Sequence, residues 1–153
     1  MSLVIEFLVA MAATVAFAVL FSVPRNDLLL CGISGALGWI FYYVCTGADF
    51  GPVFACLLAT FILTVFSRAM AVIRKNPATV YLLTGIFPLV PGAGIYYTAY
   101  GLITGDNAQF SAKGIETLEI AFAITFGIIF GFAIPQALFH RLGNWLERHL
   151  TRE

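Results

Sequence analysis

Residues 76–101 of the chain read NPATVYLLTGIFPLVPGAGIYYTAYG, an apolar stretch that is interrupted near its middle. Pro88 and Pro91 have no backbone N–H group, so the carbonyls four residues before them lose their helical hydrogen bonds. Gly92 and Gly94 follow, and glycine permits backbone conformations that other residues rarely adopt. We therefore predict a broken helix, whose second half begins near Gly92.

The composition around this stretch is that of a membrane protein. Hydrophobic residues make up 61% of the 153 residues and charged residues 10%, against about 45–50% and about 25% in soluble domains. A soluble domain of this size buries only about 68–70% of its unfolded surface, so it could not hide so much apolar surface. This excludes most soluble enzymes. Eight basic and eight acidic residues balance, and no basic tract indicates binding to nucleic acid.

Five segments have the roughly 20 apolar residues that a membrane span needs. The sequence therefore predicts an all-α polytopic integral membrane protein, a single transmembrane domain over residues 1–153 with five transmembrane helices, the fourth broken at PLVPGAG. The expected spans are 3–23, 28–46, 50–73, 78–104 and 114–139. Residues 140–153 are expected to form an amphipathic cytoplasmic tail at the lipid bilayer or a solvated continuation of the fifth helix.

The distribution of Lys and Arg predicts the orientation of these spans. All of these residues except Lys113 lie on the side of the first loop, the third loop and the C-terminus. The positive-inside rule places that side in the cytoplasm and the N-terminus outside. A re-entrant fourth segment would keep the N-terminus outside, but the length of that segment favours a full crossing. Arg68 is expected to extend its charged end to the cytoplasmic interface.

A break at membrane depth indicates function, because unpaired backbone groups are tolerated there only inside protein or beside a water-filled cavity. Discontinuous helices are common in secondary transporters, and the free N–H groups of a half-helix suit a carboxylate or another anion. The alternative is a kinked helix that only lets its neighbours pack. The candidate substrate-binding or transport residues here are Asn76, Pro88, Pro91, Gly92, Gly94, Tyr96 and Tyr97.

Three acidic residues extend this set, because ionisable residues inside a span are functional candidates. They are Glu6 in the first span and Glu116 and Glu119 in the fifth. Helical spacing places Glu116 with Ala123 and Gly127, so we expect both later glutamates to point into the bundle, where they could carry a proton or bind an ammonium group. The alternative is that their position near the start of a helix is favoured by the macrodipole alone.

Other features are expected to be structural. Small residues at Gly32, at Gly35 and in the Gly127-x-x-x-Gly131 pattern indicate close contacts between helices. The three cysteines show no CxxC spacing, and His140 and His149 have no acidic or cysteine partner at metal-ligand spacing. We therefore expect no metal or other cofactor. No known catalytic motif is present, and no catalytic residue is predicted.

Two stretches, KNPATVYLLTGIFPLVPGAGIYYTAYGLITGD and GIETLEIAFAITFG, resemble the C-terminal membrane half of the threonine/serine exporter (ThrE-like) family, in its short split-subunit (YjjB-like) form. The most specific positions are Asn76-Pro77, the PLVPGAG run with Tyr96, and Glu116-Thr117. The resemblance implies a secondary exporter in the bacterial inner membrane, which moves threonine, serine or a dicarboxylate such as succinate without ATP. It also implies a partner membrane protein that forms the other half, and a homo-oligomer is possible.

Two other classes of function stay open. The chain could be a structural or assembly subunit that packs around a substrate-binding partner without lining the transport path. It could also be a membrane-embedded enzyme acting on lipid, although no His or Asp stands beside the glutamates at a recognised spacing.

Overall fold

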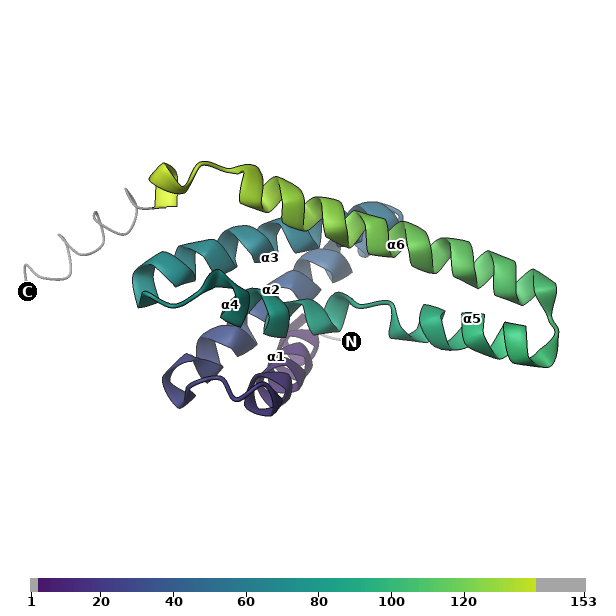
Figure 1. Ribbon diagram of the computed structural model, residues 1–153, viewed down its shortest axis with the longest axis horizontal. Helices are drawn as coiled ribbons and strands as arrows, with labels where there is room; N and C mark the ends of the chain where they lie inside the picture. The colour runs from purple at the N-terminus through teal and green to yellow at the C-terminus, as the bar shows by residue number, and fades with distance from the viewer. Residues whose placement is uncertain (1–2, 140–153) are drawn as a thin grey trace, which may run out of the picture.

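The computed structural model describes residues 3–139, and all regular secondary structure in that range is helical (Figure 1). Its four long helices are each apolar and long enough to cross a membrane. These are α1 (Leu3–Leu20), α2 (Leu28–Gly47) with the short 3₁₀-helix η1 (Arg25–Asp27) before it, α3 (Pro52–Arg74) and α6 (Asn107–Ala133). The prediction of an all-α polytopic membrane protein is confirmed.

The fourth predicted span is broken, as the sequence indicated. It consists of α4 (Ala78–Ile86), the 3₁₀-helix η2 (Phe87–Leu89) and α5 (Gly92–Thr104). Its two halves meet at 55° and together are long and apolar enough to span a membrane. Val90 is extended (φ −64°, ψ 128°), because a residue before proline is kept out of the helical region. The chain continues from α4 into α5 along the molecule and does not turn back (Figure 1).

The last long helix differs from its predicted bounds of 114–139. It begins at Asn107 because Asp106 caps it: the Asp106 carboxylate accepts a hydrogen bond from the Gln109 N–H at 3.0 Å. It ends at Ala133 because Pro135 holds Ile134 in an extended conformation (φ −63°, ψ 129°). The predicted amphipathic tail, residues 140–153, lies outside the described residues.

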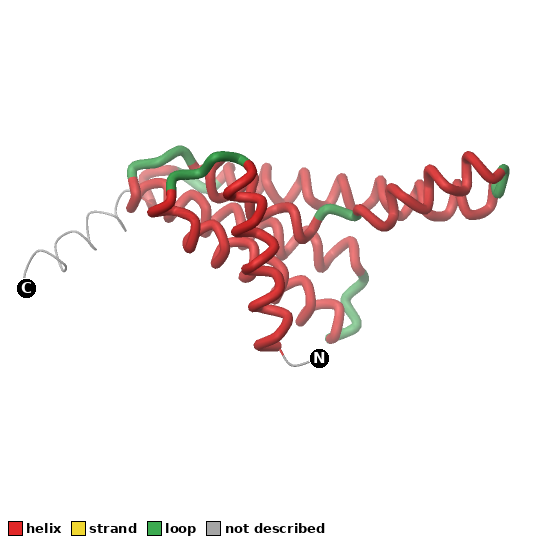
Figure 2. Tube along the Cα trace, turned by 90° about the horizontal axis from the view of Figure 1, so that it is seen from below, coloured by secondary structure: helices red, strands yellow, loops and turns green. Residues whose placement is uncertain are grey.

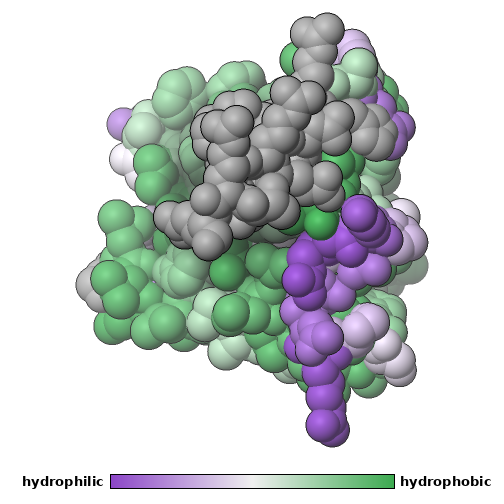
Figure 3. Space-filling model, turned by 90° about the vertical axis from the view of Figure 1, so that its left-hand side faces the viewer, coloured by the Kyte–Doolittle hydropathy of each residue, from purple (hydrophilic) through white to green (hydrophobic). Residues whose placement is uncertain are grey.

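The core forms around α2 and α3. Helix α2 packs against α1, α3 and α4, and α3 packs against α4 and α6. Small residues make these contacts close, as predicted: Gly35 faces the side chain of Thr14, and Gly131 faces that of Thr64. Seen from the end where α3 terminates, hydrophobic side chains cover most of the described surface, and hydrophilic ones gather mainly in a band at the lower right (Figure 3).

One part of the molecule extends away from this core. Within residues 3–139, α5 packs to any extent only against α6, through close approaches of Gly94 to Thr117 and of Gly101 to the backbone of Phe110. We call α5 and the paired residues 107–119 of α6 the arm. In two perpendicular views the arm projects beyond the other helices (Figures 1 and 2).

Candidate functional site

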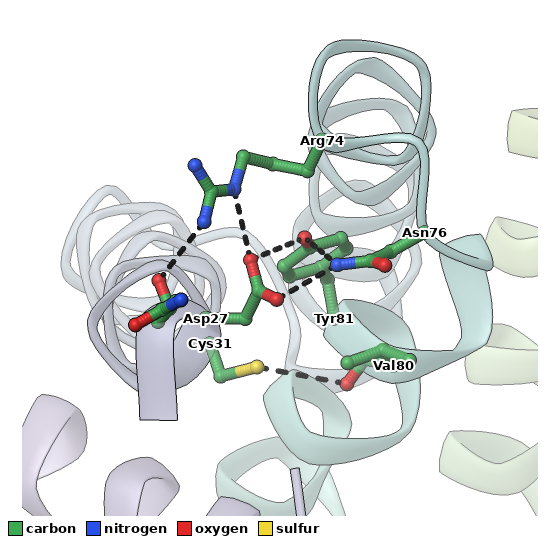
Figure 4. Close-up of polar contacts among 7 residues, drawn as sticks. Asp27, Cys31, Arg74, Asn76, Val80 and Tyr81 are labelled. Atoms are coloured by element: carbon green, nitrogen blue, oxygen red, sulfur yellow. Dashed lines mark hydrogen bonds and ion pairs between the residues drawn. The ribbon is translucent and has the colours of Figure 1, made fainter. Parts of the chain in front are cut away.

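A buried carboxylate, Asp27, anchors the start of the broken span. Asp27 is 3% exposed. One of its oxygens, Oδ1, accepts hydrogen bonds from Arg74 Nε at 3.0 Å and from the Tyr81 hydroxyl at 2.9 Å. The other, Oδ2, accepts one from Asn76 Nδ2 at 2.7 Å (Figure 4). We call these four residues the Asp27 network; it joins η1 to the end of α3 and the start of α4.

The local sequence explains how these groups meet. Lys75 adopts a left-handed conformation (φ 57°, ψ 32°) and ends α3, and Pro77 then precedes α4. This tight turn places Arg74, Asn76 and Tyr81 beside η1. Asn76 was predicted from the sequence, whereas the other three members were not. The available signal was Asp27 itself, an acidic residue in a predicted loop on the basic side of the membrane.

Further contacts fix α4 between α2 and α3. The Ser34 hydroxyl on α2 lies 3.0 Å from the backbone oxygen of Tyr81. At Gly85, an added Cβ would lie 2.6 Å from Ser34 Oγ and 2.7 Å from Leu63 Cδ1. The first half of the broken span is therefore tightly held, whereas the second half, α5, packs to any extent only against α6 within residues 3–139.

The Tyr81 hydroxyl should contribute measurably to stability. Tyr81→Phe is expected to lower the free energy of unfolding by about 1–3 kcal/mol, because a buried carboxylate oxygen loses a hydrogen-bond donor. Unfolding by SDS, followed by circular dichroism, would measure the change. Tyr97→Phe is the matched control, since Tyr97 is exposed and its hydroxyl makes no hydrogen bond within the described part of the chain. Equal effects of the two substitutions would contradict the assigned role of the network.

At the break, the two predicted glycines have different surroundings. An added Cβ at Gly92 would have no neighbour within 4 Å, whereas one at Gly94 would collide with the Thr117 hydroxyl of α6. The Gly92 N–H donates to the Val90 oxygen at 2.8 Å, and the Ile95 N–H donates to the Pro91 oxygen at 3.0 Å. Gly92 therefore borders open space, while Gly94 permits the packing of the arm.

The predicted aromatic residues Tyr96 and Tyr97 lie on α5 and are exposed. The structure does not bring them to the Asp27 network. Their rings contact each other at 5.3 Å between centroids, and Tyr96 also stacks on Tyr100 at 6.3 Å. The tyrosines thus form an aromatic surface on the arm.

The three predicted acids lie in three different environments. Glu6 is half-buried and accepts a hydrogen bond from the Trp39 indole at 2.9 Å, which links α1 to α2. Glu116 is half-buried and forms an ion pair with Lys113 at 2.7 Å.

The prediction that both later glutamates point into the bundle is wrong for Glu119. It is exposed and has no hydrogen-bond or ion-pair partner within residues 3–139. Helical spacing explains this, because Glu119 shares a face with Ile115 and Phe122, which are 58% and 61% exposed. This face turns away from the one through which Gly127 packs on α3.

The prediction that Arg68 reaches the interface is wrong. Arg68 is 9% exposed, and its Nη1 donates to the backbone oxygens of Gly131 at 2.7 Å and Ile134 at 2.6 Å. A helix leaves its last carbonyls without partners, and the helix macrodipole also stabilises a cation at this end. Arg68 therefore caps the end of α6.

The ten residues predicted from the sequence do not converge on one site of this chain. Asn76 belongs to the Asp27 network, the prolines and glycines form the break, and the glutamates are distributed over α1 and α6. Among the described residues, no group of three His, Cys, Asp or Glu side chains is placed to hold a metal ion; His140 and His149 lie outside them.

Nearly the whole chain is similar to known proteins. A family model described as "Threonine/Serine exporter, ThrE" matches residues 6–134. A protein of Haemophilus influenzae described as uncharacterized is 26% identical over 145 residues, which are 92% of this chain and 49% of that protein. A "Threonine/serine exporter" of Corynebacterium glutamicum is 25% identical over 137 residues, 90% of this chain and 25% of that protein. The chain thus spans half or less of these relatives' length, and no solved structure matches it significantly.

Proposed function

The chain belongs to the threonine/serine exporter family, and we propose that it is a membrane subunit of a secondary exporter for small polar metabolites. The substrate class is a threonine- or serine-type amino acid or a dicarboxylate such as succinate. All of these carry a carboxylate, which suits the N-terminus of a half-helix. The observation that carries this proposal, beyond the family, is the break at Val90–Gly92 in an otherwise apolar span.

We propose that the substrate carboxylate binds beside Gly92 at the start of α5. The Gly92 N–H is already engaged by the Val90 oxygen. The donors that remain are the N–H groups of Ala93 and Gly94, which have no intrahelical acceptor in the first turn of a helix and lie next to the open space around Gly92. The Asp27 network supports this role, because it fixes α4 and leaves α5 as the part of the span that can shift. Glu116, half-buried on α6 and paired with Lys113, is the candidate for carrying a proton or contacting the substrate ammonium.

The orientation that we propose is multi-pass, with the N-terminus outside and the C-terminus in the cytoplasm of a bacterial inner membrane. The Asp27 network then lies at the cytoplasmic end, and the arm lies towards the outer face. The course of the broken span from one end of the molecule to the other (Figure 1) supports a full crossing, and hence five spans.

We further propose that a partner membrane protein supplies the rest of the exporter, since the chain covers only 49% of one relative and 25% of another. A homo-oligomer is the alternative arrangement.

Efflux measurements test this function. Cells would express this chain, its candidate partner or both, and extracellular threonine, serine and succinate would be followed over time. We expect efflux only when both chains are present. Efflux from this chain alone would indicate that the exporter is a homo-oligomer and needs no partner chain. No efflux in any combination, with insertion into the membrane verified, would contradict the exporter assignment.

A structural or assembly subunit is the second candidate function, favoured by the outward position of Tyr96 and Tyr97. Cysteine substitution of Ala93 separates the two candidates, because this residue lies in the first turn of α5. If the path passes there, substrate should protect the thiol from a maleimide reagent in the assembled exporter. Labelling that is indifferent to substrate would support the assembly role.

A further inference from the structure

The two halves of the broken span differ sharply in burial. In α4, Tyr81, Leu82, Thr84 and Gly85 are buried, whereas in α5 the only buried residue is Gly101. Helix α5 thus has one packed edge, against α6, and its remaining faces are uncovered by any described part of the chain.

The uncovered face of α5 carries more than aliphatic side chains. Tyr96 is 62% exposed, Tyr100 49% and Ile103 84%, and helical spacing puts these three residues opposite the edge formed by Gly94 and Gly101. The tyrosine hydroxyls make no hydrogen bonds within the described residues. In hydrocarbon, polar groups without partners are costly, so lipid tails are a poor neighbour for this face. Tyrosine is enriched at protein interfaces and, at the level of the lipid headgroups, at membrane–water interfaces; crosslinks to lipid alone would mark the second case.

The length of the relatives indicates what covers this face. More than half of each relative lies outside the part that this chain matches, and that remainder must pack against the matched part if the two form one transporter. Helices α2 and α3 each pack against three other helices, whereas among the described residues α5 packs to any extent only against α6, and the arm stands apart from the other helices (Figure 2).

We propose that the outward face of α5, formed by Tyr96, Tyr100 and Ile103, is the docking surface for the partner membrane chain. The partner's helices cover the tyrosine rings and supply hydrogen-bond partners to their hydroxyls. This inference rests on the proposed function and adds a consequence to it. The open space beside Gly92 is then completed by the partner, so the substrate path runs between α5 and the second chain.

Site-specific photocrosslinking tests this surface in intact membranes. Benzoylphenylalanine would replace Tyr96, Tyr100 or Ile103 in the full chain, expressed in cells of its own host. Val9 on α1, 58% exposed, is the control position on another apolar surface. Mass spectrometry would identify each crosslinked chain. We expect the α5 positions, and not Val9, to capture the same membrane protein whose presence efflux requires.

Three results would overturn the docking surface: crosslinks to lipid alone, crosslinks only to a second copy of this chain, or equal capture from Val9. Efflux that requires two chains, without capture at α5, would refute the surface and leave the proposed function intact. Capture of a partner that supports no efflux of any tested metabolite would refute the function and leave the surface intact.

A double substitution gives an independent measurement. Tyr96→Ala with Tyr100→Ala should reduce copurification of the partner about tenfold or more. A few large side chains such as tyrosine contribute most of the binding energy of an interface, and alanine removes them. Its unfolding in SDS should match that of the unaltered chain, since both side chains are exposed. Val9→Ala is the control. Unchanged copurification in the double variant would contradict the proposal.

Discussion

Gly127→Leu is expected to prevent this protein from folding stably. A Cβ at Gly127 would lie 2.7 Å from the backbone oxygen of Leu57, 2.9 Å from Thr60 Cβ and 3.1 Å from the Phe61 nitrogen. Two of these three atoms belong to the backbone of α3, which cannot move aside as a flexible side chain can. Overpacking a core costs about 1–3 kcal/mol and occasionally more, and we expect leucine here to exceed the upper end of that range.

Alanine substitutions in the same helix make this prediction quantitative. Gly→Ala in a helix interior is intrinsically favourable by about 1 kcal/mol. At Gly114 the new Cβ would meet only Thr98 Cγ2 at 3.4 Å, so Gly114→Ala should be neutral or stabilising. Gly127→Ala should destabilise the protein. The free energy of unfolding in SDS would measure both, and equal values would mean that α3 and α6 are not packed as described.

The break and the glycine contacts could be predicted from the sequence because both have local causes. Pro88 and Pro91 remove hydrogen bonds wherever they stand in a helix, so the start of α5 at Gly92 followed from their positions. Gly127 and Gly131 recur at a helical spacing, which marks a face that approaches another helix. Neither inference required knowledge of which helices are neighbours.

The Asp27 network and the cap made by Arg68 could not be predicted in this way. Arg74 and Asp27 are brought together by the packing of separate helices, and their contact cannot be predicted from the spacing of residues within one helix. Arg68 appeared to lie at the end of a span, where a long basic side chain ordinarily reaches the interface. Its burial follows from Pro135, which ends α6 early and leaves carbonyls that Arg68 satisfies.

The candidate site was only partly predictable for a related reason. Periodicity placed Glu116 on the packed face of α6, but Glu119 lies on the exposed face. From the sequence, Gly92 and Gly94 were predicted to be equivalent parts of one motif. Only the neighbours of each position distinguish a glycine that borders open space from a glycine that lets two helices touch.

That distinction leads to the sharpest test of the proposed path. Gly92→Leu should reduce efflux about tenfold or more, which corresponds to about 1.4 kcal/mol or more in substrate binding. The added side chain would occupy the open space beside the first N–H groups of α5. The backbone at Gly92 lies outside the positive-φ region. Apart from its neighbours in the chain and the backbone of its own helix, no atom lies within 4 Å of the new Cβ. The folded state should therefore accept leucine, and unfolding in SDS should be unchanged.

Two further glycines control this experiment. Gly51→Leu adds the same side chain at another position without neighbours within 4 Å, and it should leave both efflux and stability unchanged. Gly94→Leu should lower both, because its side chain collides with Thr117 and separates α5 from α6. Loss of efflux at Gly92 with full stability would place the substrate beside the break. Normal efflux in Gly92→Leu, at normal abundance, would remove the break from the transport path and leave it as a device for packing the arm.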